Sequence, residues 1–235
     1  YNANPNKYKG KYWKQTVDID MSDVLQDVKF TPIGTTTAFS GFYDGDNKKI
    51  KNLTISSGAE EVGLFGNVTD GSSLKNIVLD KSCSVSGNAA GCNIGALAGR
   101  VGGASTIENC TSYAAVTSNA PASFGGTISY AGGLVGSLSA ESKIINGKNY
   151  GAVAQTAAHT LFAGGIAGHQ GSGTMIAGCE NHGAVTAASA SSLGNKAGST
   201  AGGITASTVG GYISGCYNDG TVAAGMQAGG ITGST

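Results

Sequence analysis

The chain has 235 residues and no formal net charge, with 40 glycines, 3 prolines and 12% charged residues, about half the usual charged share. The glycines follow no three-residue period, which excludes collagen, and the 40% hydrophobic content excludes a disordered tail. The balanced charge, with Arg100 as the single arginine, argues against a nucleic-acid partner. No apolar run approaches the ~18 residues of a membrane span.

Residues 1–38 contain no repeat and are predicted to form an N-terminal cap and first strands. Twenty of the 28 charged residues lie in positions 1–81, and only eight lie in 82–235. A charged, non-repeating segment is suited to shield the exposed edge of a first repeat unit. The chain begins with Tyr1 rather than Met, which suggests a processed or trimmed chain.

Residues 39–235 consist of two alternating motifs. The first motif is VGLFG (62–66), GALAG (95–99), GGLVG (132–136), GGIAG (164–168), GGITA (202–206) and GGITG (229–233). The second is LKNIVLDKSC from Leu74, IENCTSYAAV from Ile107, IINGKNYGAV from Ile144, IAGCENHGAV from Ile176 and ISGCYNDGTV from Ile213, with an earlier copy, IKNLTI, at Ile50. The final copy of the first motif, GGITG, is not followed by a copy of the second motif, so the repeat is expected to continue in the native protein.

The spacing of the motifs predicts a solenoid of short strands. The distance from the first motif to the second is nearly constant, whereas the return path varies from nine residues (Val222 to Ile231) to nineteen (Val185 to Ile204). Apolar and small polar residues alternate between Gly and Asn turns, which is typical of strands. Stacked coils can pair such strands at ~4.8 Å and satisfy their backbone groups. We therefore expect an all-β, single-stranded parallel β-helix of about six coils, right-handed by the general rule for parallel crossovers.

The paired motifs resemble the GLUG repeat of bacterial surface proteins, which include adhesins and the repeat regions of some immunoglobulin-cleaving peptidases. The segments YWKQTVDIDM, FTPIG and FSGFYDGDNKKIKNLTI are similar to the usual start of such a domain. Gly147 and Ala206 depart from the pattern, where other coils have Cys and Gly. The resemblance implies a cell-surface or secreted bacterial protein, associated with the outer membrane, and does not identify a ligand.

Two ladders of equivalent residues are predicted to be structural. Cys110, Cys179 and Cys216 share one repeat position and are expected to point inward as small buried thiols. Adjacent coils would also permit a Cys179–Cys216 disulfide, and a Cys83–Cys92 bridge is a further alternative. Asn149, Asn181 and Asn218 share another position, where Asn tolerates left-handed backbone and can bond from coil to coil.

One position further along lie Tyr113, Tyr150, His182 and Asp219. This row is interpreted either as a sugar-stacking surface, because aromatic rings offer apolar faces with polar tips, or as surface residues at turns. The segments of variable length, 117–131, 154–163 and 186–201, are predicted to form a loop face for ligand contact. They contain Phe124, Tyr130, His159, Phe162 and Lys196.

Neither a cofactor nor a metal site is expected. There is no CxxC pair, and DGDN (44–47) lacks the later Glu of a calcium loop and resembles a plain hairpin turn. A glycosidase needs two carboxylates close together, and the acids considered for this role are Glu108, Glu141, Glu180 and Asp219. If these are scattered in the structure, the enzymatic interpretation loses its support.

The sequence favours a non-enzymatic adhesion module, expected to be monomeric, that contacts host glycan or extracellular protein. Two alternatives remain open. One is a polysaccharide lyase or hydrolase, by analogy of fold alone. The other is a passive stalk of a larger surface protein.

Overall fold

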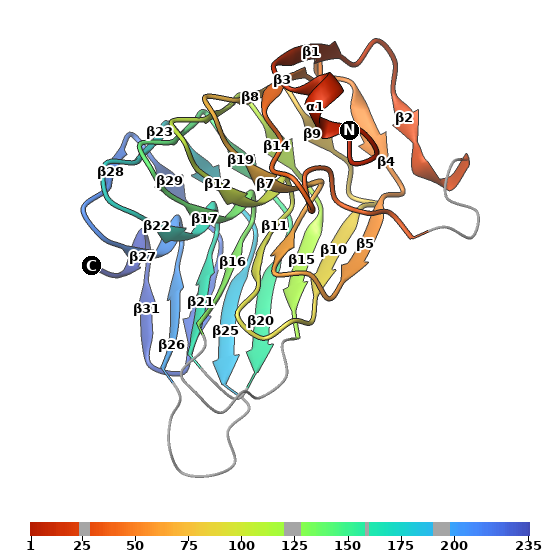
Figure 1. Ribbon diagram of the computed structural model, residues 1–235. Coiled ribbons are helices and arrows are strands. Elements are labelled where there is room, and N and C mark those ends of the chain that lie inside the picture. The colour runs from red at the N-terminus through yellow and green to blue at the C-terminus, as the bar shows by residue number, and fades with distance from the viewer. Residues whose placement is uncertain (24–28, 120–127, 158–159, 190–197) are drawn as a thin grey trace.

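The chain winds into six successive coils of five short parallel strands (Figure 1). A computed structural model describes residues 1–23, 29–119, 128–157, 160–189 and 198–235. Each coil contributes one strand to each of five parallel sheets, which we number I to V in the order in which the chain passes through them. The predicted parallel β-helix of about six coils is therefore confirmed.

Sheets I and II each gain an additional strand from the N-terminal segment. Sheet I contains β1 (Lys11–Lys14), β3 (Gly41–Asp44), β8 (Ser73–Lys75), β13 (Thr106–Glu108), β18 (Lys143–Ile145), β23 (Met175–Ala177) and β28 (Tyr212–Ser214). Sheet II contains β2 (Ile19–Asp20), β4 (Lys49–Lys51), β9 (Val78–Leu79), β14 (Thr111–Ser112), β19 (Lys148–Asn149), β24 (Glu180–Asn181) and β29 (Tyr217–Asn218).

The remaining three sheets are formed by the six coils alone. Sheet III contains β5 (Thr54–Ser57), β10 (Ser84–Gly87), β15 (Ala115–Ser118), β20 (Val153–Ala157), β25 (Val185–Ser189) and β30 (Val222–Ala224). Sheet IV contains β6 (Glu61–Val62), β11 (Asn93–Gly95), β16 (Ser129–Gly132), β21 (Leu161–Gly164), β26 (Ser199–Gly202) and β31 (Gln227–Gly229). Sheet V contains β7 (Phe65–Val68), β12 (Ala98–Val101), β17 (Val135–Leu138), β22 (Ala167–Gln170), β27 (Thr205–Thr208) and β32 (Thr232–Ser234).

Equivalent residues of the repeat lie above one another in the interior. Leu74, Ile107, Ile144 and Ile176 are in register along sheet I, and all four are fully buried. Because successive side chains of a strand point to opposite faces, the residues between them face outward. The hydrophobic core is thus a set of columns that run along the solenoid axis, and the same register places the outward residues in columns.

The first coil is covered by the N-terminal segment, which includes the short helices α1 (Pro5–Tyr8) and η1 (Met21–Asp23). β1 pairs in register with β3, and β2 pairs with β4. The ring of Phe39 packs against those of Tyr1, Trp13 and Phe65, with centroids 4.9–5.6 Å apart. This aromatic cluster closes the N-terminal end of the core.

The first glycine of the first motif permits a close backbone approach within the corner of its own coil. A Cβ atom on Gly132 or Gly164 would lie 1.9 Å from the carbonyl oxygen of Val135 or Ala167. No side chain fits there, since real Cβ atoms do not approach within 3.0 Å of another heavy atom. The repeated glycine of this motif is therefore required by packing.

The DGDN segment is a turn, as expected, but it does not form a hairpin. Asp46 and Asn47 have positive φ values of 50° and 58°, and Lys48 N donates to Gly45 O at 2.8 Å. The turn connects β3 of sheet I to β4 of sheet II, so the strands on either side pair with neighbouring coils and not with each other.

Candidate functional site

The outer surface of sheet II carries two columns of side chains, because its strands alternate inward and outward residues. The first column is Lys49, Val78, Thr111, Lys148, Glu180 and Tyr217. The second column begins just beyond the strand ends and contains Asp80, Tyr113, Tyr150, His182 and Asp219, whose backbone N–H groups bond to the preceding coil. The row predicted from the sequence therefore exists.

The aromatic members of this row form a continuous stack. The rings of Tyr113 and Tyr150 are 4.7 Å apart with an interplanar angle of 12°, and those of Tyr150 and His182 are 4.7 Å apart at 14°. Such offset stacking is favourable, but it places a neighbouring ring against the faces of Tyr150. The expectation that the whole row offers ring faces to a sugar is corrected: among the described residues, only the face of Tyr113 on the side of Asp80 has no ring against it.

The other end of the stack is a network of charged groups. His182 Nδ1 lies 2.7 Å from Asp219 Oδ1, and His182 Nε2 lies 3.2 Å from Glu180 Oε2. Lys148 Nζ donates to both oxygens of Glu180 at 3.0 and 3.1 Å, and these bonds hold the pKa of the Glu180 carboxyl below its usual value. The polar groups at this end therefore pair with one another.

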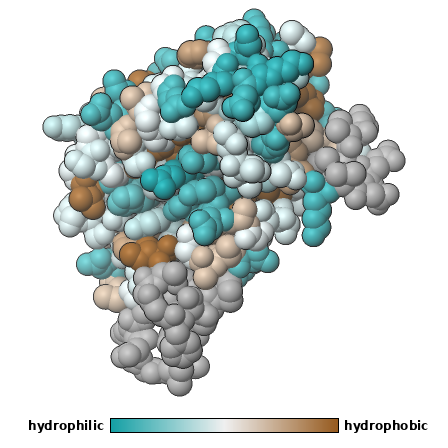
Figure 2. All heavy atoms as spheres, viewed as in Figure 1, coloured by the Kyte–Doolittle hydropathy of each residue, from teal (hydrophilic) through white to brown (hydrophobic). Residues whose placement is uncertain are grey.

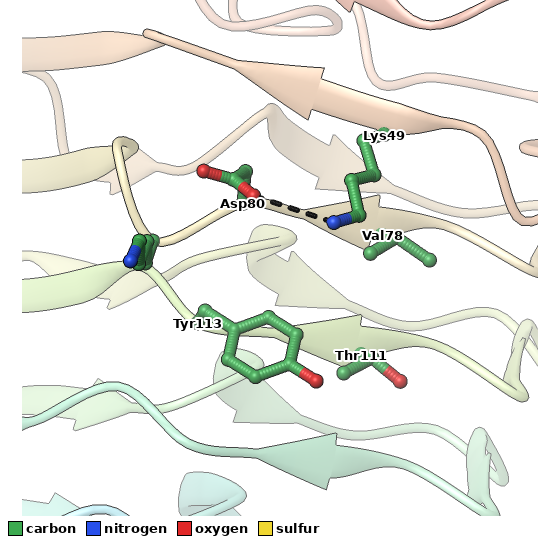
Figure 3. Close-up of a pocket in the computed structure, with 6 residues that line it drawn as sticks. Lys49, Val78, Asp80, Thr111 and Tyr113 are labelled. Carbon is green, nitrogen blue, oxygen red and sulfur yellow. Dashed lines mark ion pairs between the residues drawn. The ribbon is translucent and has the colours of Figure 1, made fainter.

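A pocket of about 340 Å³ opens beside the free face of Tyr113 (Figure 3). Its lining residues are Lys49, Val78, Asp80, Lys81, Thr111 and Tyr113. Asp80 Oδ2 lies 3.7 Å from Lys49 Nζ, and Asp80 Oδ1 accepts hydrogen bonds from the N–H and hydroxyl of Ser82 at 3.1 and 3.0 Å. The bond from the Ser82 N–H is the main cause of the lowered pKa of Asp80, so its carboxylate stays ionised at neutral pH.

The pocket arises because the repeat changes at this point. Asp80 occupies the position that is aromatic in the next coils, and its shorter side chain leaves the ring of Tyr113 uncovered. A flat ring, one carboxylate and two lysines are the groups that orient a small polar ligand with one apolar face. Sequence reasoning missed Asp80 and Lys49, although the alignment of LKNIVLD with IENCTSY shows Asp80 at the position of Tyr113.

The cysteines lie in the interior, as free thiols. Cys110 and Cys179 are fully buried, and Cys216, in the last coil, is half-buried. Burial raises the pKa of the Cys110 thiol to about 12. Cys83 contacts the carbonyl of Ile50, and Cys92 contacts the hydroxyl of Ser118. The structure contains neither of the disulfides considered above.

The asparagine ladder also lies inside, except for Asn218, which is half-exposed in the last coil. Asn149 Nδ2 donates to Asn181 Oδ1 at 2.8 Å, and Asn181 Nδ2 donates to Asn218 Oδ1 at 2.7 Å. The expected left-handed backbone is not found at these three residues. It occurs one turn earlier at Asn52, Asn76, Asn109 and Asn146, where φ is 51–56°. The ladder residues end strands of sheet II. At the turn that follows, their side-chain amides bond to backbone groups, as Asn149 Nδ2 does to Gly151 O.

Tyr130 and Phe162 lie on strands β16 and β21, which corrects their assignment to loops. They are half-buried outward residues of sheet IV, because the parallel ladder extends into these segments. Phe124, His159 and Lys196 lie outside the described residues.

The four acids considered for catalysis do not form one cluster. Glu180 and Asp219 meet at His182, whereas Glu108 lies on sheet I and Glu141 in the turn after sheet V. Within the described residues, no three His, Cys, Asp or Glu side chains gather in a way that could hold a metal ion. Over the same residues, no helix is long and apolar enough to cross a membrane.

Comparison with known proteins supports the architecture. No protein-family model matches the chain. A stretch of 126 residues is 34% identical to part of Halomucin from Haloquadratum walsbyi; the match covers 49% of this chain and 1% of that protein. The fold is similar to the crystal structure of a Bacteroides ovatus protein provisionally named an immunoglobulin A1 protease, with a TM-score of 0.66 and 22% identity over 96% of this chain and 78% of the other. At this identity the likeness shows the fold alone.

Proposed function

We propose that the chain is a non-enzymatic binding module of a cell-surface or secreted protein, and that the pocket beside Tyr113 holds one sugar unit of an extracellular glycan. The observation that carries this proposal is the uncovered ring face of Tyr113 at the end of a rigid aromatic stack. A sugar ring has one relatively apolar face, which packs on an aromatic ring, and hydroxyl groups at its edge. Asp80 and Lys49 supply an acceptor and a donor for those hydroxyls.

The rigidity of the site favours binding. Tyr113 is 41% exposed and Tyr150 is 39% exposed, yet Tyr113 is supported on its other face by Tyr150. A side chain that is already ordered loses little conformational entropy when a ligand binds. The ring of Tyr113 is therefore already held in place for a ligand.

A binding role accounts for the acidic groups better than catalysis does. Glu180 is paired with Lys148 and His182, and Asp219 with His182. A general acid and a general base must be available to the substrate. These carboxylates are instead engaged with basic groups beside them on an open surface.

The proposed location follows from the repeat and from the comparison. The assignment to the GLUG repeats of bacterial surface proteins is part of this proposal, as is association with the outer membrane. The similarity of half the chain to a stretch of Halomucin supports an extracellular location. The hydrophilic and neutral surface in Figure 2, where brown hydrophobic residues form only separate patches on the face shown, is compatible with it.

The experiment is a screen on an array of host and microbial glycans, followed by calorimetric titration of the best glycan. Tyr113→Ala should weaken binding at least tenfold, because it removes the ring. Asp80→Tyr should abolish binding while leaving the fold intact, because a further ring would extend the stack and fill the pocket. Tyr217→Ala, at the opposite end of sheet II, is the matched control and should bind like the parent. Equal binding by all four proteins would refute the proposal.

A further inference from the structure

Sheets IV and V meet in a re-entrant corner on the outside of the solenoid, which we call the IV–V corner. From the second coil on, each glycine that ends the first motif lies against the sheet IV strand of the preceding coil. A Cβ on Gly99 would be 2.4 Å from Val62 N, and one on Gly136 would be 2.5 Å from Ile94 N. As a result, Thr200 and Ser137 are only 5% and 8% exposed although they occupy outward positions.

The outward residues of the two sheets therefore face each other in rungs across the corner. In order along the axis, the rungs are Glu61 with Arg100, Asn93 with Ser137, Tyr130 with His169, Phe162 with Ser207, and Thr200 with Ser234. The contact is direct in the third rung, where the rings of Tyr130 and His169 are 4.8 Å apart. The corner thus changes from a charged rung to aromatic rungs.

The first rung contains a carboxyl group with an unused oxygen. Glu61 Oε1 accepts from Asn93 Nδ2 at 3.1 Å, whereas Glu61 Oε2 is buried and has no hydrogen-bond partner among the described residues. Burial raises the pKa of Glu61 to about 7, despite the opposing effects of Asn93 and Arg100. Arg100 is exposed and forms no ion pair within the described part of the chain.

The third and fourth rungs present rings. Tyr130 and Phe162 have ring centroids 5.4 Å apart, and both are half-buried. His169 Nδ1 is buried without a hydrogen-bond partner among the described residues, and burial lowers the pKa of this imidazole. At neutral pH His169 is therefore an uncharged group with an unused nitrogen beside two aromatic rings.

We propose that the IV–V corner is a second binding site, which takes an acidic oligosaccharide that lies along the solenoid axis. Arg100 binds a carboxylate of the sugar chain, and Tyr130 and Phe162 pack against a sugar ring further along. Two coil steps separate the first and third rungs, about 10 Å, so the ligand contains more than one sugar ring. This site shares no residue with the pocket beside Tyr113.

The two ends of the corner together select this ligand. Arg100 can bind a carboxylate through two N–H groups, and the uncharged Glu61 beside it does not repel that carboxylate. An uncharged glycan would use the rings but would leave Arg100 without a partner. A short acidic peptide would satisfy Arg100 but would not provide the flat surface that the Tyr130 and Phe162 rings accommodate.

The protonation of Glu61 gives the site a distinctive pH dependence. The charged groups near Glu61 are Glu60 and Arg100. When Glu61 loses its proton, its negative charge repels the carboxylate of the ligand. If only the protonated form binds, a pKa of about 7 weakens binding up to about thirty-fold between pH 6 and pH 8.5. His169, whose pKa is lowered, stays neutral over this range.

The test is calorimetric titration of the whole chain with tetragalacturonate, with its methyl ester as the uncharged counterpart, at pH 6 and pH 8.5. The parent should bind tetragalacturonate at least tenfold more tightly at pH 6 and should bind the ester weakly at both pH values. Arg100→Gln should reduce affinity at least tenfold. Glu61→Gln should keep the affinity seen at pH 6 and lose the pH dependence, because Gln is uncharged at both pH values.

Controls separate this proposal from that for the pocket beside Tyr113. Tyr130→Ala should weaken binding of tetragalacturonate, and Tyr113→Ala should not. The proposal is wrong if the ester binds as tightly as the acid, if tetragalacturonate does not bind, or if the pH dependence persists in Glu61→Gln. Circular dichroism of each variant verifies that the coils are intact.

Discussion

The asparagine ladder offers the sharpest test of how the coils are held together. Asn181 is fully buried, donates to Gly183 O at 2.9 Å and to Asn218 Oδ1 at 2.7 Å, and accepts from Asn149. Asn181→Ala removes three hydrogen bonds and leaves the buried carbonyl of Gly183 without this donor. A buried unsatisfied group costs ~1–3 kcal/mol and each of the two other lost bonds costs ~1 kcal/mol. The free energy of unfolding should therefore fall by about 3–5 kcal/mol.

Asn218→Ala is the matched control, because Asn218 has the same repeat position but is half-exposed in the last coil. Water can replace its partners, and Asn181 keeps its bond to Gly183, so the expected cost is about 1 kcal/mol. Urea unfolding is followed by circular dichroism, which reports on all strands, and by the fluorescence of Trp13, which reports on the N-terminal end. A cost below about 0.5 kcal/mol for Asn181→Ala, or equal costs for both variants, would refute this account.

Three further predictions concern the core, the glycines and acid stability. Cys179→Asp should destabilise by several kcal/mol in urea, because an unpaired charge would be buried; unfolding at the parent's urea midpoint would place this thiol outside. Gly203→Ala should strongly lower the melting temperature, since its Cβ would lie 2.0 Å from Gly230 O, whereas Gly230→Ala, with no neighbour within 4 Å, should melt like the parent; equal melting would contradict the packing role. A bond from Asn76 lowers the pKa of Asp44, so this stabilisation is complete above about pH 5 and is lost as the pH falls further. Asp44→Asn should flatten the loss of stability between about pH 5 and pH 2, and an unchanged slope would show that Asp44 contributes little.

The fold could be predicted from the sequence because each coil contains the same two motifs at nearly the same spacing. The constant nine-residue spans from Ile107 to Val116, Ile144 to Val153 and Ile176 to Val185 fix the register. The register brings the row of Tyr113 and Tyr150 together. The pairing of outward residues across the IV–V corner could not be predicted in the same way. Glu61 and Arg100 come from different coils and sheets, and only the corner between those sheets brings them face to face.

The orientation of the rings could likewise not be predicted from the sequence. Spacing shows that aromatic residues recur, but it does not show that their rings turn toward one another and cover the faces between them. The burial of Glu61, which raises its pKa, also depends on the shape of the corner and not on neighbouring sequence.

Both proposed sites lie where the repeat changes, and there is a physical reason for this. Equivalent side chains in adjacent coils satisfy one another, as the stacked rings of Tyr150 and His182 and the amides of Asn149 and Asn181 do. A column that continues unchanged has no unused groups for a ligand. Where the residue type changes, a ring face or a charged group such as Arg100 loses its partner in the next coil and becomes available. Ligand contacts on this solenoid are therefore expected at interruptions of a column, such as Asp80 before Tyr113.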